Sequence, residues 1–144
     1  MQQIKRMNRI REELQLCHAD GTVALTVNVD INTDDIAAQI RAAYEQFEAV
    51  KALLNAEGAG KEQEQAAGEA LLALFRLIFG PDDLQKMLAF YDGREAEMLL
   101  DVFPFVRDEI LLKVFTAANA RKAQIVKFFK QAPQTPHETA HETV

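Results

Sequence analysis

The chain has 144 residues, of which 49% are hydrophobic, so it is long enough to form one domain with a real core. Its 22 acidic and 16 basic side chains give a net charge of −6, which argues against a protein that coats nucleic acid through a positive overall field. Cys17 has no disulfide partner, and the longest apolar run, 70–79, is far shorter than the ~20 residues of a membrane span. We therefore expect a soluble protein of the cytoplasm that has no membrane partner.

The first 32 residues are expected to form a basic arm followed by a β-hairpin. Hydrophobic residues occupy every second position over 23–31, which is typical of a strand with one buried face. The segment 14–16 supplies a partner strand, and Asp20 and Gly21 form a common hairpin turn. Because two strands alone are marginally stable in water, their apolar face must lie on helices or on a second copy of the chain.

A long helix is expected after the hairpin. Side-chain oxygens over 32–35 can accept hydrogen bonds from the free backbone N–H groups of its first turn. Gly58 and Gly60 provide the backbone freedom that a helix end needs. Apolar residues recur between them every three or four positions and form one stripe: Ile36, Ile40, Ala43, Phe47, Val50 and Leu54.

A second helix is expected over 61–79. Its second half is apolar on most sides, which is typical of a helix at the centre of a bundle or at an oligomer contact. Gly80 suits the end of this helix, and Pro81 suits the first turn of a short third helix that closes at 92–93.

The last helical pattern begins near 94–95 and contains Pro104. A proline inside a helix removes one backbone hydrogen bond and clashes with the preceding turn, so we expect a kink or a restart near Phe103. The apolar stripe continues to Phe115 and resumes after an alanine-rich stretch at Ile125, Val126, Phe128 and Phe129. From Ala132 the composition turns to Pro, Thr, His and Glu, which predicts a disordered tail.

These patterns predict a mainly α-helical protein, with an N-terminal β-hairpin followed by a bundle of four to five helices and a disordered C-terminal tail. The expected divisions are 1–32 for the arm and hairpin, 33–131 for the helical domain and 132–144 for the tail.

One motif matches a catalytic pattern. Residues 137–141 read HExxH, which places two zinc-binding imidazoles and a glutamate base on one helix face. This copy lies in the proline-bearing tail, whereas a catalytic site needs a rigid helix, a third ligand and a cleft. The sequence also has no glycine-rich phosphate loop and no nucleophile motif, so we expect no enzyme activity, no metal and no cofactor.

Two features have alternative interpretations. The basic clusters at 5–11 and 121–130 would contact nucleic acid if they converged, whereas a solvated face and a favourable helix end explain the same charges. The surplus of Phe and Leu in the third and fifth helical segments is either core or an exposed face for a partner helix or for self-association.

Five short motifs follow one another along the chain: Phe79-Gly80, Phe90-Tyr91 before Asp92-Gly93, Glu97-Met98-Leu99, Phe103-Pro104-Phe105-Val106, and Arg121-Lys122-Ala123-Gln124. This order resembles a family of small tail proteins of siphophages and Gram-positive prophages, the tail assembly chaperones. The resemblance covers roughly residues 35–130, and its motifs are structural rather than catalytic.

The resemblance implies a non-catalytic helper that binds the long helical tape measure protein, keeps it soluble and helps to recruit tail tube proteins in the bacterial cytoplasm. The resemblance also implies that this chain is the short form of two products, and that a frameshifted long form diverges from it in the tail. We also expect the protein to be a homo-oligomer. The expected partner-contacting side chains are apolar and line a groove for amphipathic helices: Phe75, Ile78, Phe79, Met87, Tyr91, Phe103 and Phe105.

Two other functions remain open. A small helical nucleic-acid-associated regulator of a mobile element would use the basic clusters, and its binding would weaken steeply with salt, unlike that of an apolar groove. A structural tail-completion protein would differ from a chaperone by remaining in the finished virion.

Overall fold

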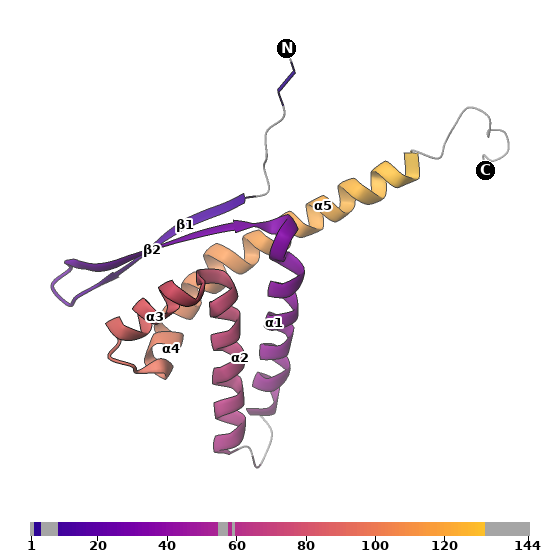
Figure 1. Ribbon diagram of the computed structural model, residues 1–144. Coiled ribbons are helices and arrows are strands. Elements are labelled where there is room, and N and C mark those ends of the chain that lie inside the picture. The colour runs from indigo at the N-terminus through magenta and orange to yellow at the C-terminus, as the bar shows by residue number, and fades with distance from the viewer. Residues whose placement is uncertain (1, 4–8, 55–57, 59, 132–144) are drawn as a thin grey trace, which may run out of the picture.

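The computed structural model describes residues 2, 3, 9–54, 58 and 60–131 (Figure 1). Its elements are β1 (Arg9–Cys17), β2 (Val23–Asn32), α1 (Thr33–Leu54), α2 (Lys61–Phe79), α3 (Pro81–Phe90), α4 (Glu95–Phe105), the π-helical segment η1 (Val106–Leu111) and α5 (Leu112–Gln131). The predicted fold class, a mainly helical protein behind an N-terminal antiparallel hairpin, is confirmed. The tail predicted to be disordered, 132–144, lies outside the described residues, as does most of the predicted basic arm.

The hairpin has the predicted turn. Its strands pair antiparallel from Arg9 opposite Asn32 to Cys17 opposite Val23, with an irregularity between Leu16 and Cys17. The backbone N–H of Gly21 donates to the carbonyl oxygen of His18 across 2.9 Å, and Gly21 has a φ of +91° that a side chain would disfavour. The strand β1 begins at Arg9, so two of the predicted arm cations belong to the sheet.

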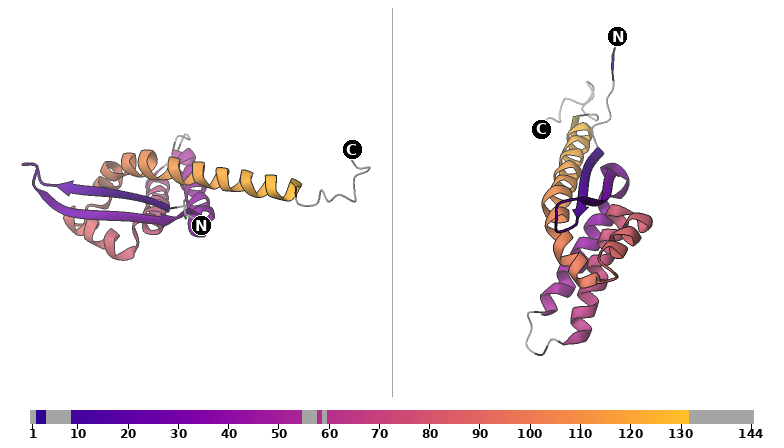
Figure 2. Two further views of the ribbon diagram at one scale, coloured as in Figure 1. Left: turned by 90° about the horizontal axis from the view of Figure 1, so that it is seen from above. Right: turned by 90° about the vertical axis from the view of Figure 1, so that its left-hand side faces the viewer.

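One face of the hairpin is buried on the helices, as the alternation predicts. Val27, Val29 and Ile31 of β2 are buried, whereas Val23 beside the turn is exposed. The strand β2 contacts α1, α2 and α3, and β1 contacts η1 (Figures 1 and 2). Hairpin and helices therefore share one hydrophobic core.

The start of α1 and the boundaries between α2 and α3 follow the predicted signals. The side-chain oxygen of Asn32 accepts a hydrogen bond from the N–H of Asp34 across 3.0 Å, which satisfies a free donor of the first turn of α1. The helix α2 occupies the predicted range, and Gly80, with a φ of +85°, separates it from Pro81 at the start of α3. The helices α1 and α2 lie side by side in opposite directions (Figure 1).

A helix boundary lies close to the break predicted near Phe103, because α4 ends at Phe105 and η1 begins at Val106. The helix α4 passes through Pro104 to Phe105, and the backbone continues through η1 into α5 without leaving the helical path. Within η1 the backbone widens, because the N–H of Leu112 donates to the carbonyl oxygen of Arg107, five residues earlier. The widened π-helical segment thus directly follows the helix that contains Pro104.

The helix α5 is buried only along its first half. Val114 is fully buried, whereas every described side chain over 119–130 is exposed. Figure 1 shows this second half extending away from the body, on the side opposite the hairpin turn. Within the described residues, no helix is long and apolar enough to cross a membrane.

The packing predicts that two leucines differ in how much their substitution by alanine lowers the stability of the fold. Leu74 on α2 is 0% exposed and Leu100 on α4 is 76% exposed. We expect Leu74→Ala to lower the free energy of unfolding by about 2–5 kcal/mol, because it leaves a cavity. The matched change Leu100→Ala should alter it by less than about 0.5 kcal/mol. Urea unfolding followed by circular dichroism measures both, and equal losses would contradict this packing.

Candidate functional site

The described residues hold no metal-binding cluster of three or more His, Cys, Asp or Glu side chains. The HExxH motif at 137–141 lies outside them. His18 lies at the hairpin turn, where its N–H donates to the carbonyl oxygen of Thr22 and its ring lies 5.9 Å from that of Phe90.

Four of the seven predicted partner-contacting side chains lie in the core. Phe75, Ile78, Phe79 and Met87 are buried, so the expectation that they are exposed is wrong. The reason is the central position of α2, which packs against α1, α3, α4 and β2 and buries its apolar second half on several sides.

The other three predicted side chains are half-buried and pack inside the molecule. The ring of Phe103 lies 5.8 Å from that of Phe47, and the ring of Phe105 stacks 6.3 Å from that of Phe79. The hydroxyl of Tyr91 donates to the carboxylate of Asp101 across 3.1 Å, which joins the end of α3 to α4. These side chains stabilise the bundle, and they do not form an open groove.

An apolar surface does exist, on the second half of α5, where the sequence predicted a continuation of the inner stripe. The sequence left open whether apolar residues of the last helical segment are core or an exposed face, and four large side chains here are about half exposed or more: Ile125, Val126, Phe128 and Phe129. The rings of Phe128 and Phe129 contact each other at 5.3 Å. We call the exposed segment 119–130 the α5 tip.

The α5 tip is also basic. The whole of α5 contains five Lys or Arg residues and no Asp or Glu. Arg121 pairs with Asp34 of α1 at 3.3 Å, an exposed ion pair worth about 0–1 kcal/mol. Lys122, Lys127 and Lys130 make no ion pair with any residue in the described ranges. Their charges are therefore available to an acidic partner.

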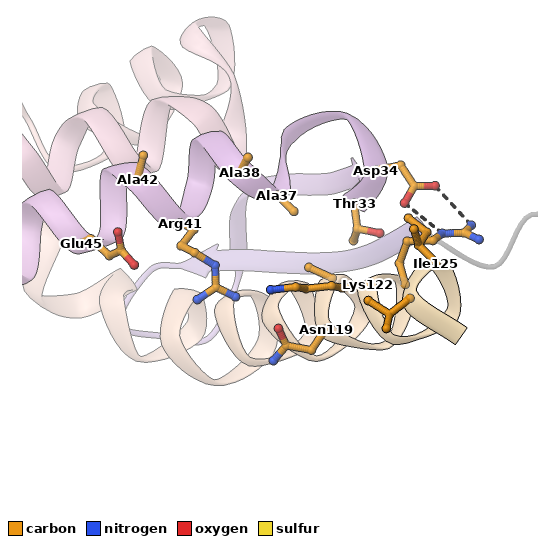
Figure 3. A pocket seen from close by; sticks show the side chains of 13 residues that line it. Thr33, Asp34, Ala37, Ala38, Arg41, Ala42, Glu45, Asn119, Lys122 and Ile125 are labelled. Carbon is orange, nitrogen blue, oxygen red and sulfur yellow. Dashed lines mark hydrogen bonds and ion pairs between the residues drawn. The ribbon is translucent and has the colours of Figure 1, made fainter. Parts of the chain in front are cut away.

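A groove lies between the first half of α1 and the base of the α5 tip (Figure 3). Its volume is about 920 Å³, and small side chains line much of it: Ala37, Ala38, Ala42 and Ala118. Small residues let the backbone of another helix approach closely. At one end of the groove Asp34 meets Arg121, and Ile125 and Val126 of the α5 tip form part of the wall (Figure 3).

Charged residues border the groove on the α1 side. Glu45 lines it, and Arg41 lies with its guanidinium 4.4 Å from the centre of the Phe115 ring. This cation–π contact fixes Arg41 over the packed part of α5. The groove and the α5 tip together form one continuous surface of apolar, small and charged side chains, and we call them the α1/α5 surface.

The described members of the predicted N-terminal basic cluster, Arg9 and Arg11, do not line this surface. Arg9 and Arg11 of β1 lie 2.8 and 3.7 Å from the carboxylate of Asp30, and the hydrogen bond from Arg9 is the main cause of a lowered pKa for Asp30. The other members, Lys5 and Arg6, lie outside the described residues. Lys122, Lys127 and Lys130 therefore form the basic part of the α1/α5 surface on the α5 side.

Comparisons with protein-family models, curated proteins and solved structures find no match to this chain.

The contact between Tyr91 and Asp101 predicts that the Tyr91 phenol loses its proton at an unusually high pH. Burial, with the hydrogen bond to Asp101, raises the pKa of Tyr91 from 10.0 to about 12, so the folded state favours the protonated phenol. The stability from this contact is complete below pH 10 and is lost as the pH rises through 12.

In Tyr44→Phe protein, where Tyr91 is the only tyrosine, we expect phenolate absorbance to appear well above pH 10. Asp101→Asn should lower the midpoint only in part, because burial remains. The same variant in denaturant is the control, and identical midpoints in the folded and unfolded protein would contradict the contact.

Proposed function

We propose that the chain is a non-catalytic phage tail assembly chaperone that binds the tape measure protein and assists tail tube assembly in the cytoplasm of the bacterial host. The observation that carries this proposal is the α1/α5 surface, which combines exposed apolar side chains, small groove residues and lysines that make no ion pair with the described residues. Such a surface suits an amphipathic helix whose apolar stripe is flanked by acidic residues.

The order of motifs along the chain supplies the identity of the partner. Long helical proteins expose amphipathic faces until they assemble, and an unassembled tape measure protein needs a cover for such faces. The α5 tip offers its aromatic and aliphatic side chains at an open surface, where contacts form and exchange without unfolding the bundle. These properties support a transient binding role, and tail tube recruitment follows from the same resemblance.

The basic character of α5 favours a second candidate, a nucleic-acid-associated regulator. Five cations without an acid lie on one helix, beside two exposed phenylalanines. The charge of the other residues opposes this role. The whole chain has a net charge of −6 and α5 contributes +5, so the residues outside α5 carry −11. Phosphate binding would therefore compete with strong repulsion from the body.

The partner should be recovered by affinity purification. We expect the tagged full-length chain, taken from cells that produce the parent phage or prophage, to retain a very long helical protein and a tail tube protein after low-salt and high-salt washes. Mass spectrometry of the eluates identifies both proteins. Recovery of nucleic acid alone, lost at high salt, would contradict the chaperone function and favour the regulator.

A groove substitution tests the position of the site. Ala38 is exposed and lines the groove, and Ala96 is exposed on α4. We expect Ala38→Trp to reduce recovery of the tape measure protein by at least about tenfold, because the indole fills the space that a helix backbone needs. The matched variant Ala96→Trp should bind like the parent chain. Loss of binding in both variants, or in neither, would place the site elsewhere.

A further inference from the structure

The hairpin has two outer edges that pair with no other strand of the described chain, because its sheet contains β1 and β2 alone. Between 23 and 31, no backbone N–H or carbonyl is hydrogen-bonded to a helix or to a side chain in the described ranges. The outer edge of β2 is therefore a row of backbone donors and acceptors that another strand could satisfy.

The outer edge of β1 is protected against a further strand. Four of its nine residues are charged, and charged side chains discourage strand addition at the edges of natural sheets. The segment η1 contacts β1, and Lys113 at the start of α5 pairs with Glu12. The side of the sheet that β1 borders is therefore both charged and partly occupied.

The outer edge of β2 has little of this protection. Asp30 is its only charged residue, and Arg9 and Arg11 already lie beside that carboxylate. The strand has no proline, and the irregularity in its pairing is confined to the turn end, opposite Leu16 and Cys17. Residues 25–32 of β2 thus form a regular run with one edge open.

The helix α3 lies on the open side of β2. It contacts β2, and in the left view of Figure 2 it extends past the outer edge of β2, on the side away from β1. Leu88 and Phe90 of α3 are half-buried. A strand added beside β2 would lie over α3, so the interface that buries the hairpin on the helices would continue across it.

We propose that the outer edge of β2 is a docking site for an extended segment of another protein, which adds a third strand to the sheet. The backbone of β2 supplies the hydrogen bonds. The segment has apolar side chains at every second position, because these side chains face α3 while the alternate ones face solvent.

The position of α3 selects a single strand over a second copy of the chain. Two hairpins joined edge to edge, with one continuous buried face, would place the helices of both copies under that face. Because α3 already extends past the edge, the α3 of a second copy would need the same space. The site takes an extended segment rather than a helix, and it is therefore independent of the function proposed for the α1/α5 surface.

The test is hydrogen exchange of the full chain, followed by NMR, with a defined peptide. The probe is a short peptide in which valine and threonine alternate and the backbone nitrogens along one edge are methylated, so it pairs only through its other edge. We expect saturating peptide to slow exchange at alternate N–H groups of 25–31 by at least about tenfold, because those donors gain acceptors. Exchange along β1 should not change.

A second peptide separates backbone pairing from side-chain contact. It has the same sequence and is methylated along both edges, so it keeps every side chain and loses the N–H donors that pair with β2. We expect it to protect none of these N–H groups.

Two lysine substitutions test which strand the peptide pairs with. Thr26 of β2 and Gln15 of β1 lie directly opposite each other, and both are exposed. Thr26→Lys should weaken binding of the peptide several-fold, because a lysine on an edge strand discourages strand addition. Gln15→Lys should bind like the parent chain. Circular dichroism verifies that both variants are folded.

Three results would overturn the inference. Slow exchange along the whole of 25–31 without peptide would mean that the edge is already covered. Unchanged exchange at about 1 mM peptide, or equal protection by the two peptides, would mean that the edge does not accept a strand. Equal effects of Thr26→Lys and Gln15→Lys would place the peptide elsewhere.

Discussion

Burial of the apolar face of the hairpin is the constraint that arranges the rest of the molecule. Two strands cannot hold Val27, Val29 and Ile31 out of water by themselves, so α1, α2 and α3 must pack beneath β2. Because β2 leads directly into Thr33, α1 begins at the end of the hairpin. The strand β1 packs on η1, and Glu12 pairs with Lys113, which fixes the start of α5. The groove between α1 and α5 is therefore a consequence of how the hairpin is covered.

The sequence predicted those features that depend on local chemistry. Alternation over 23–31 identified the buried face of β2, and Gly80 and Pro81 placed the end of α2 and the start of α3 at the observed residues. Pro104 shows the limit of such rules, because a proline constrains only its own hydrogen bond and the preceding turn. Whether the backbone then kinks or widens depends on the packing that follows. Here Val106, Ile110 and Leu111 are all buried, and the π-turn of η1 accommodates them.

The candidate site was the part that sequence patterns missed. Phe75 and Phe129 both occupy apolar stripes of similar period, yet one is fully buried and the other is 63% exposed. The difference arises from neighbours distant in the chain, since α2 lies among α1, α3, α4 and β2, whereas the cover over α5 ends with the first turn of α1. A signal was nevertheless present, because α5 has five cations and no acids, and an unbroken charge of one sign is unusual for a helix that closes a core.

The composition of the α1/α5 surface favours partners that bind transiently. Four large apolar side chains close together on a projecting helix are an aggregation risk if they stay in water. A permanent interface would bury them among other large side chains at core density. The α1/α5 surface instead presents alanines and lysines, and the stems of lysine side chains cover apolar area. Affinity for a partner helix then comes from a few aromatic and aliphatic contacts and from charge attraction. Any acidic amphipathic helix can make both kinds of contact, so one such helix can replace another.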